Sequence, residues 1–545
     1  QPEMVFLPEF ATTLPNSNFK FAKKRMANWG RRDPQGAMEE IDVEMNVIRD
    51  FARRVLLSEE TFQEEGNTFV NMFSGEWSGT SKLNKYDLSS MYFNYAGSIY
   101  SQNFPIIDIV MNTMLKQEES DQGRHFFRMF NGMGDDQRAA SYLNGKSFEQ
   151  AVLDNTLSTE VFYEMMKLKG VYLRNYINSR LSSNEFKEFM AEFTKRYQFQ
   201  EVNFTRLNSE FIRKFHFNLM DFIPNWYTIN STPRFIVKGV DADQVEVGDY
   251  TKYIVKFQVY NPTNVEGVIS VNVEEGGGMF PGGPRGRRGR AAQMEAKPAK
   301  NYIIEPQKYK EIRILCDERP SNLTINTNIS QNLPSTIMQN FAKVTTTTTD
   351  TVTGIFDSNA TLFTFNPKEI TVDNEDPGFR IIESNQKNKL QSFFKKESED
   401  KYKNLNFWMP PSRWTATIGV NYYGDYINSA VYKKSGSGSN KTEWTTQIQI
   451  PGFYEVFVYT SELPMMGWRH RGGEEKKIQY YTVKHDDGEE EISVETGRGR
   501  QGWRTLGSFY FSKGEAKITL SDKGSESNQI IFADAVKWVY TNNNK

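Results

Sequence analysis

The spacing of hydrophobic residues changes once along this chain of 545 residues, near residue 228. Before that point the pattern is helical, and Ser182 and Glu185 stand three residues apart, as in a capping box. After it, apolar and polar residues alternate, first around Phe235 and then over residues 250–261. Alternation of this kind is typical of strands with one buried face. The change therefore predicts a mainly helical N-terminal part followed by β-structure.

Helices are predicted where apolar residues recur at spacings of three and four. Two such segments are residues 40–56 and 103–116, and a third follows the capping box. The apolar stripe of this third helix consists of Phe186, Phe189, Met190, Phe193 and Tyr197.

A chain of this length exceeds a single hydrophobic core, so we expect a multidomain α+β protein. We predict a helical domain over 1–227, a middle β-sandwich-like domain over 228–344, and a β-segment with a charged linker over 345–405. The last domain, 406–541, is predicted as an antiparallel β-sandwich of jelly-roll type. Residues 275–300 are rich in glycine, proline and arginine, and predict a mobile loop.

The C-terminal domain shows turn signals about every ten residues. Asp487-Gly488 stands between two alternating runs and predicts a two-residue hairpin turn. One buried face is predicted from the alternation of Phe509, Phe511, Ile518 and Leu520. Three tryptophans inside strand patterns are predicted as core residues: Trp444, Trp503 and Trp538.

Composition excludes several classes of protein. The net charge of -2 gives no overall footprint for nucleic acid. The single cysteine, Cys316, permits no intramolecular disulfide. No apolar run is long enough to span a bilayer, so no transmembrane segment is predicted. The chain begins at Gln1 without a signal peptide, and we expect that a leader was removed or that a larger upstream part precedes it.

The last domain resembles a known family. The segments that carry the resemblance are "GFYEVFVYT", "YYTVKHDDGEEEI", "GWRTLGSFYFSKGEAKITLSD" and "ADAVKWVY". Between about Trp414 and Tyr540 they are similar to the golvesin and xanthan-lyase C-terminal domain. The resemblance implies a β-sandwich with a carbohydrate-binding role, attached to bacterial envelope enzymes.

A second resemblance covers residues 80–345, through "EVFYEMMKLKGVYLRNYINSRL" and "DFIPNWYTINSTPRFIV". These segments are similar to the C-terminal half of zinc aminopeptidases of the aminopeptidase N type, in which a Lys-Gly pair, here Lys169-Gly170, opens a helix. That family binds zinc through HExxH, but no two of the four histidines here are four residues apart. No catalytic residue, metal site or cofactor is therefore predicted, and the protein is expected not to be an enzyme unless an HExxH site lies upstream of Gln1.

Exposed aromatic residues in loops are the predicted glycan-binding residues. Trp468 lies in a loop with Arg469 and His470, so that its indole could stack on a sugar ring while its neighbours bond hydroxyls. Tyr422, Tyr423 and Tyr426 form a second group. In each case the alternative is an aromatic side chain that packs on the sandwich.

Two acidic segments offer weaker sites. Asp486 and Asp487 could hold calcium through carboxylate oxygens, although a solvated hairpin tip is the simpler account. "DNEDPGF" (373–379) predicts a turn. The arginines at 285–290 predict a solvated loop rather than nucleic-acid binding.

Together these patterns favour a non-catalytic bacterial cell-envelope protein, periplasmic or at the cell surface, with a C-terminal module that binds a polysaccharide, an envelope glycan or a protein partner. One alternative is the C-terminal portion of a zinc aminopeptidase-like protein. Another is a structural subunit of a membrane or surface assembly.

Overall fold

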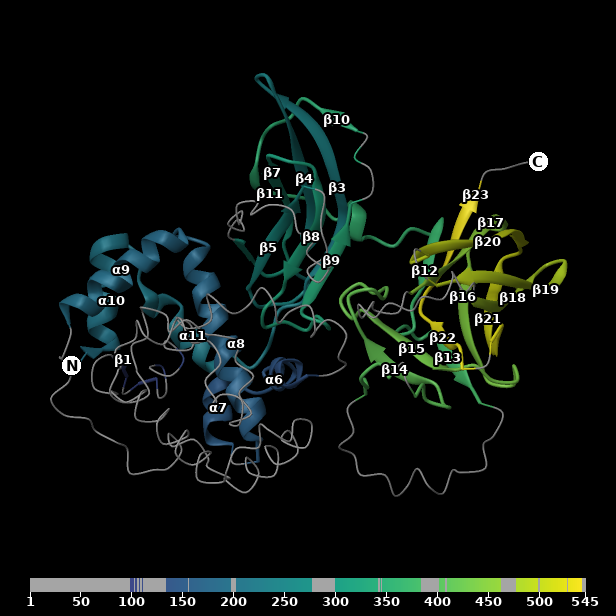
Figure 1. Ribbon diagram of the computed structural model, residues 1–545, viewed down its shortest axis with the longest axis horizontal. Coiled ribbons are helices and arrows are strands. Elements are labelled where there is room, and N and C mark those ends of the chain that lie inside the picture. The colour runs from purple at the N-terminus through teal and green to yellow at the C-terminus, as the bar shows by residue number, and fades with distance from the viewer. Residues whose placement is uncertain are drawn as a thin grey trace, which may run out of the picture. The chain divides into compact units, whose positions relative to one another are not determined.

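The computed structural model describes residues 99–101, 134–197, 202–276, 299–383, 401–461 and 477–541, with short gaps inside these ranges, and single positions between 103 and 110. Figure 1 shows the helices in the first part of the described chain, which also holds the two-residue strands β1 (Ile99–Tyr100) and β2 (Val202–Asn203), and the longer strands after them. This order confirms the predicted multidomain α+β architecture. The predicted helix at 40–56, most of the glycine- and arginine-rich loop and residues 384–400 of the charged linker lie outside the described residues.

Helices of the first compact unit follow the predicted pattern; this unit holds residues 1–124, 169–174 and 181–227. Helix α9 (Ser183–Arg196) begins with the expected capping box, in which Ser182 Oγ accepts the Glu185 N–H at 3.2 Å and the Glu185 carboxylate accepts the Ser182 N–H at 2.9 Å. Its stripe is buried, and Phe189 meets Phe211 of α10 (Phe204–Phe215) with ring centroids 5.1 Å apart. In the segment 103–116 the structure describes Ile107 and Val110 as helical and buried.

Lys169 lies at the contact between α8 (Thr159–Asn178) and α11 (Ile223–Thr228). Its Nζ donates to the Trp226 carbonyl at 2.5 Å, while the Trp226 indole N–H donates to the Lys169 carbonyl at 3.3 Å. Complete burial lowers the pKa of Lys169 to about 7. Lys169 of the Lys-Gly pair thus connects two helices in this structure.

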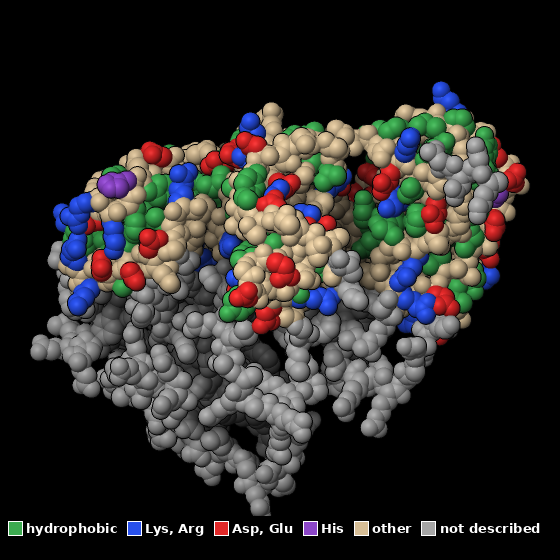
Figure 2. All heavy atoms as spheres, turned by 90° about the horizontal axis from the view of Figure 1, so that it is seen from above, with side chains coloured by type: hydrophobic (Ala, Val, Ile, Leu, Met, Phe, Trp, Pro, Cys, Tyr) green, Lys and Arg blue, Asp and Glu red, His purple; other side chains and the backbone are tan. Residues whose placement is uncertain are grey.

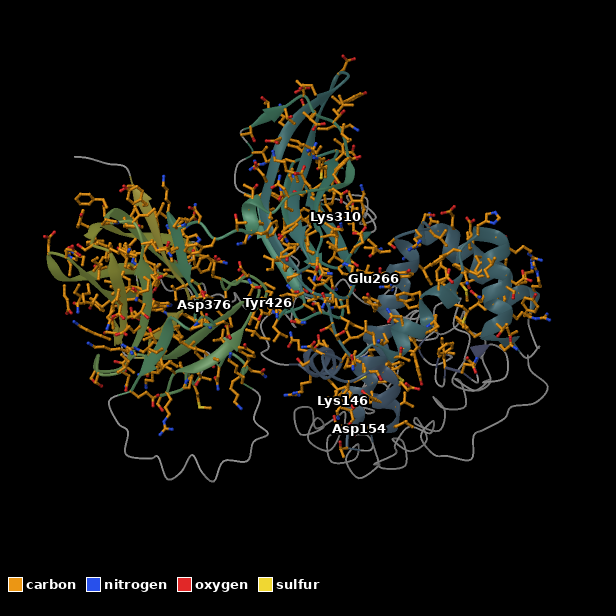
Figure 3. The ribbon with its side chains drawn as sticks, turned by 180° about the vertical axis from the view of Figure 1, so that it is seen from behind. Lys146, Asp154, Glu266, Lys310, Asp376 and Tyr426 are labelled. Atoms are coloured by element: carbon orange, nitrogen blue, oxygen red, sulfur yellow. The ribbon has the colours of Figure 1, made fainter. Side chains whose placement is uncertain are left out.

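The remaining helices are short. Among the described residues they are α6 (Asp135–Tyr142), α7 (Phe148–Leu153) and the 3-10 helices η4 (Leu219–Asp221) and η5 (Thr361–Phe363). Asp154, just after α7, accepts hydrogen bonds from Tyr142 Oη at 2.6 Å and Lys146 Nζ at 3.0 Å, and both Lys146 and Asp154 are labelled in Figure 3. Among the described residues, no helix combines the length and apolarity that a membrane crossing requires.

Two sheets form the middle β-domain. One has the order β10-β3-β4-β7-β11 and the other β6-β5-β8-β9. They share one core, in which Val255, Phe257, Ile269 and Ile325 are fully buried. The strand bounds are β3 (Ile236–Val247), β4 (Tyr250–Tyr260), β5 (Gly267–Glu275), β6 (Lys300–Ile304), β7 (Tyr309–Cys316), β8 (Pro320–Asn326), β9 (Thr336–Asn340), β10 (Thr347–Thr348) and β11 (Gly354–Asp357).

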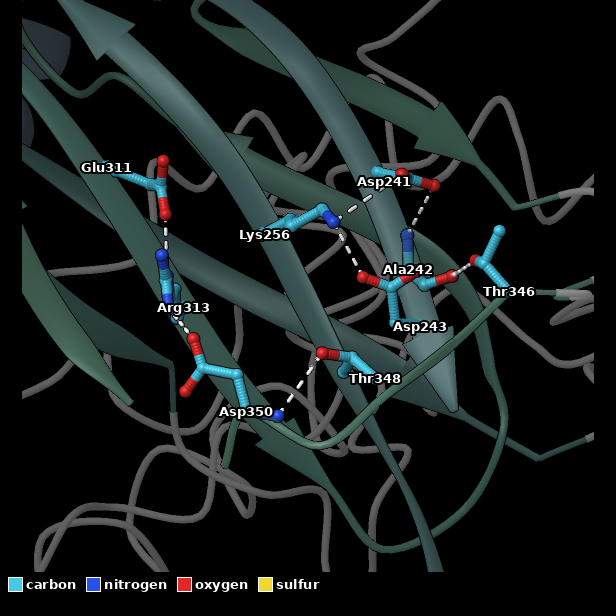
Figure 4. Close-up of polar contacts among 9 residues, drawn as sticks. All are labelled: Asp241, Ala242, Asp243, Lys256, Glu311, Arg313, Thr346, Thr348 and Asp350. Carbon is cyan, nitrogen blue, oxygen red and sulfur yellow. Dashed lines mark hydrogen bonds and ion pairs between the residues drawn. The ribbon is translucent and has the colours of Figure 1, made fainter. Parts of the chain in front are cut away.

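Charged side chains cover the five-stranded sheet of this domain (Figure 4). Lys256 contacts Asp243 at 2.6 Å and Asp241 at 3.8 Å. Arg313 pairs with Glu311 at 2.5 Å and also with Asp350. Lys256 thus connects β4 to β3, and Arg313 connects β7 to the segment after β10.

The C-terminal domain is the predicted antiparallel sandwich. Its two main sheets have the orders β12-β23-β17-β20 and β13-β16-β21-β18-β19, and a third sheet has the order β14-β15-β22. Trp444, Trp538 and Ile518 are at most 1% exposed in the shared core. The strands are β12 (Glu369–Val372), β13 (Phe379–Ile382), β14 (Thr415–Ile418), β15 (Ser429–Lys434), β16 (Lys441–Ile448), β17 (Gly452–Thr460), β18 (Lys477–His485), β19 (Gly488–Thr496), β20 (Gly502–Phe511), β21 (Gly514–Gly524), β22 (Ile530–Ala533) and β23 (Val536–Thr541).

The segment 345–405 is divided between the two β-domains. β10 and β11 pair with β3 and β7 of the middle domain. β12 and β13 pair with β23 and β16 of the C-terminal sandwich. The C-terminal sandwich therefore includes strands that begin at Glu369.

Two details of the C-terminal domain differ from the sequence expectation. The tight turn between β18 and β19 is Asp486-Asp487, one residue earlier than predicted, because His485 pairs with Gly488 and only Gly488 takes a positive φ, 131°. Trp503 is not in the core: it lies opposite Tyr459 on the outer side of its sheet. Trp444 and Trp538 are core residues, as expected.

We predict that Lys433→Met destabilises the C-terminal sandwich by about 3–5 kcal/mol. Lys433 pairs with Asp522, and their side chains are 3% and 0% exposed. Asp522 also accepts from the Gly438 N–H at 2.7 Å and from Asn440 Nδ2 at 2.9 Å, so removing the ammonium leaves a buried carboxylate without its counter-charge. Hydrogen exchange of the β15 and β21 amides measures the effect.

Lys434→Met, one position along the same strand and partly exposed, is the matched control and should change exchange little. The double variant Lys433→Met/Asp522→Asn should recover part of the loss. Equal protection in the single variant and the unchanged protein would contradict a stabilising role for the pair.

Candidate functional site

The structure separates the predicted glycan-binding residues. Trp468, Arg469 and His470 lie outside the described residues. Tyr422 is only 6% exposed and packs on Phe532, with ring centroids 5.9 Å apart. A ring buried in this way offers no face to a ligand, so Tyr422 serves the small core beneath the three-stranded sheet.

Tyr423 and Tyr426 point to different surroundings. The guanidinium of Arg234 lies over the Tyr426 ring, 4.0 Å from its centroid, so one face of that ring is already occupied. Tyr426 is labelled in Figure 3. Tyr423 is partly buried and contacts Tyr459 and Trp503, with centroids 5.7 Å and 5.1 Å away. Tyr423 thus contacts two rings that belong to β17 and β20.

The two weak calcium candidates form a structural turn. Asp486 accepts the Ser512 N–H at 3.0 Å and also bonds the Ser512 hydroxyl, which lowers the pKa of its carboxyl group. Asp487 is exposed at the same turn. No three His, Cys, Asp or Glu side chains in the described part of the chain are placed to hold a metal ion together. Asp486 therefore joins two hairpins through hydrogen bonds to Ser512.

The "DNEDPGF" segment forms the predicted turn, closed by the Asp376 N–H bonding the Asp373 carbonyl at 3.1 Å. It also does more than the sequence indicated, because it places a carboxyl group inside the sandwich. Asp373 is 7% exposed, and Asp534, in the loop between β22 and β23, is 1% exposed. Burial, and then the charge of Asp534, raise the pKa of Asp373 to about 9. Burial likewise raises the pKa of Asp534 well above the usual carboxyl range.

Hydrogen bonds hold this carboxyl pair in position. Asp534 accepts from the Tyr423 N–H at 3.2 Å and from Ser461 Oγ at 2.9 Å. Asp373 accepts the Asn374 N–H at 2.7 Å. Ser461 directly follows β17, so Asp534 fixes the end of that strand.

Further polar contacts surround the turn. The neighbouring Glu375 bonds Lys401 at 2.5 Å, Tyr402 at 3.1 Å and Ser429 at 2.6 Å. Asp376, labelled in Figure 3, is exposed at the turn, and partial desolvation by its surroundings raises the pKa of its carboxyl group. The turn is thus tied to strand β15 and to the segment before β14.

An aromatic face lies on the outer side of the sheet β12-β23-β17-β20. Tyr454, Val456 and Val458 of β17 point into the core, so the alternating residues point outward. Strand register sets Phe453 opposite Tyr510 and Tyr459 opposite Trp503. We call these four residues and Phe457 the aromatic face. Figure 2 shows hydrophobic side chains between charged ones on the surface of this domain.

Ring contacts divide the aromatic face into two groups. Phe453 and Tyr510 meet edge-to-face, with centroids 5.3 Å apart, and they are 40% and 38% exposed. Tyr459 and Trp503 also meet edge-to-face at 5.3 Å. Lys537 Nζ lies over the Trp503 ring at 4.7 Å and over the Phe457 ring at 5.6 Å. Chemically, this arrangement can stack on the C–H faces of a flat ligand and bond its hydroxyl groups.

We predict that Asp373→Asn reduces the pH dependence of stability of the sandwich. The folded protein keeps its carboxyl protons where the unfolded chain has lost them, so the free energy of unfolding falls as pH rises from about 4 towards about 9. The slope is about 1.4 kcal/mol per pH unit for each proton retained. Asparagine keeps an oxygen for the Asn374 N–H and removes one ionisation. Hydrogen exchange of β17 and β23 amides across this pH range measures the slope.

Asp487→Asn, which removes an exposed carboxylate from the same domain, is the matched control. The prediction fails if the slope of Asp373→Asn equals that of the unchanged protein while the amides remain protected.

Comparison with known proteins supports the C-terminal resemblance. Residues 403–540 match the Golvesin C-terminal domain. A search of curated proteins found no match. No comparison supports the aminopeptidase resemblance of the N-terminal part.

Solved structures give distant likenesses. Xanthan lyase from Paenibacillus is 13% identical, with a TM-score of 0.23 over 57% of this chain, which covers 26% of the lyase. A family 35 carbohydrate-binding module from Clostridium thermocellum is also 13% identical, with a TM-score of 0.20 over 31% of this chain and 98% of the module. A two-domain protein of unknown function from Bacteroides fragilis is 9% identical, with a TM-score of 0.14 over 56% of this chain and 94% of that chain. The similarity that identifies a family is thus the one to the Golvesin C-terminal domain, over residues 403–540.

Proposed function

We propose that the C-terminal sandwich is a carbohydrate-binding module and that the aromatic face is its binding surface. The observation that carries the proposal is the placement of aromatic rings on the outer side of a sheet whose inner side already holds the core. The match to the Golvesin C-terminal domain supports it, through the carbohydrate-binding role that the resemblance implies.

The chemistry of the face suits a sugar. Aromatic rings stack on the C–H groups of a pyranose, while neighbouring polar atoms bond its hydroxyls. Glu455 and Thr505 lie beside the rings, 3.3 Å apart between Oε1 and Oγ1, and Lys537 adds an ammonium group.

The setting of the module is part of the same proposal. Because the resemblance implies attachment to bacterial envelope proteins, we place this chain in the periplasm or at the cell surface, where envelope glycans are accessible. Cell fractionation with an antibody against the chain tests this placement. Recovery of the protein in the cytoplasmic fraction alone would reject it.

We predict that the full chain is retained on polysaccharide and that Trp503→Ala weakens retention three- to tenfold, which corresponds to about 0.5–1.5 kcal/mol of lost stacking. Affinity electrophoresis in gels that contain soluble polysaccharides measures retention. Tyr250→Ala, which removes a 73% exposed ring from the middle domain, is the matched control.

Two outcomes would argue against the proposal. Retention by no polysaccharide would reject carbohydrate binding. Capture of a purified envelope protein without any polysaccharide retention would instead favour a docking role for the module.

A further inference from the structure

We propose, on the basis of the proposed function, that the aromatic face binds a linear, uncharged oligosaccharide that lies along β17 and occupies two separate subsites. The end subsite consists of Phe453 and Tyr510. The cluster subsite consists of Phe457, Tyr459 and Trp503. Neither subsite was among the residues that the sequence pattern singled out for ligand binding.

The end subsite is the more open of the two. Phe453 and Tyr510 lie directly opposite each other across β17 and β20, and each exposes more than a third of its surface. Their planes are inclined by 77°, so that the pair forms an angled ledge rather than a flat stack. Thr541 of β23 is opposite Phe453 on the other side and places a hydroxyl group beside the ledge.

The cluster subsite is more rigid. Trp503 contacts Tyr459 and Tyr423 edge-to-face, at 5.3 Å and 5.1 Å. Tyr423 is in turn held through its backbone N–H by the buried Asp534. Because its rings are fixed in this way, the cluster subsite loses little conformational freedom when a ligand binds, and we assign it the tighter contact.

Polar groups lie between the two subsites. Glu455 stands midway along β17, opposite Ser508 on β20 and Val539 on β23. A strand rises about 3.3 Å per residue, so the α-carbons of Phe453 and Phe457 are roughly 13 Å apart. This separation exceeds one sugar ring. A monosaccharide can therefore occupy one subsite only, whereas a longer chain can stack at both ends and bond Glu455 between them.

Charge selects the ligand class. Lys537 is the cation of the face, and its Nζ pairs with Glu369 at 3.3 Å. Glu455 adds a second carboxylate within the same four-stranded sheet. Because this ammonium group is paired, and the carboxylates of Glu369 and Glu455 belong to the same sheet, the described part of the face around Lys537 carries no excess positive charge to favour uronates or phosphates. An uncharged glycan suits a surface whose ammonium group is already paired.

The experiment uses the full chain on an array of linear oligosaccharides, neutral and uronate-containing, from monosaccharides to decasaccharides. The strongest ligand series is then titrated by calorimetry against three proteins: the unchanged chain, Phe453→Ala/Tyr510→Ala, and Trp503→Ala. Phe365→Ala, which removes a 66% exposed ring that precedes β12, is the control. Trp503→Phe keeps a ring in case the alanine variant unfolds.

We expect neutral chains to bind and affinity to rise with chain length. Loss of the end subsite should weaken long ligands roughly tenfold and leave short ones unchanged, whereas Trp503→Ala should weaken both roughly tenfold. If both variants weaken binding but the strongest ligand is acidic, or if the end variant weakens short and long ligands alike, the inference fails and the proposed function stands. If glycans bind but both variants bind like the control, the inference fails, the aromatic face is not the binding surface, and only carbohydrate binding remains of the proposed function. If no array member binds, the proposed function itself fails, and the inference with it.

Discussion

The alternation of β17 is the constraint on which the C-terminal sandwich and its surface both depend. Tyr454, Val456 and Val458 are at most 1% exposed, and they fix which side of the strand meets the core. A slip of one residue would exchange the two faces and bury the aromatic face in place of the core residues. β23 and β20 hydrogen-bond to the two edges of β17 and secure the register. The same pairing that buries the core therefore places the aromatic rings on the outer side of the sheet, where Phe453 and Tyr510 are exposed.

A buried polar group connects this sheet to the loops at one end of the sandwich. Asp534 lies between β22 and β23, where its carbonyl accepts the Trp444 indole N–H at 3.1 Å. Its carboxyl group bonds Tyr423 and Ser461, so core, tyrosine loop and the end of β17 meet at one residue. Because burial keeps the acid protonated, the arrangement stabilises the fold most at low pH and less as pH rises. Stability and the geometry of the cluster subsite are thus coupled.

Sequence periodicity predicted the elements better than it predicted their surroundings. The capping box at Ser182 and the buried alternation of Phe509, Ile518 and Leu520 were confirmed because each depends on neighbours close in the chain. Trp503 was wrongly assigned to the core. A bulge at Val456/Phe457 changes the register of β20 between Gly507 and Thr505, so the side chains on the two sides of Leu506 do not follow one continuous alternation.

Long-range packing accounts for the other differences. Tyr422 and Tyr423 are adjacent in sequence, yet one packs on Phe532 and the other on Trp503. Nothing in "NYYGDY" distinguishes them, since Phe532 and Trp503 lie far away in the sequence. Asp534 is similar: "ADAV" carries no sign of burial or of a second carboxyl group at Asp373. The pairing of β12 with β23 brings the two carboxyl groups together, because Asp373 directly follows β12 and Asp534 lies just before β23.

The boundary of the module follows from the same pairing. The family similarity begins at residue 403, yet β12 and β13 end at Val372 and Ile382 and form the outermost strands of the two main sheets. Without them, β23 and β16 would each expose an unpaired edge, and exposed edges favour association between chains. Asp534 would also lose the turn that carries Asp373. The physical unit that presents the aromatic face therefore begins near Glu369, ahead of the region that sequence similarity marks.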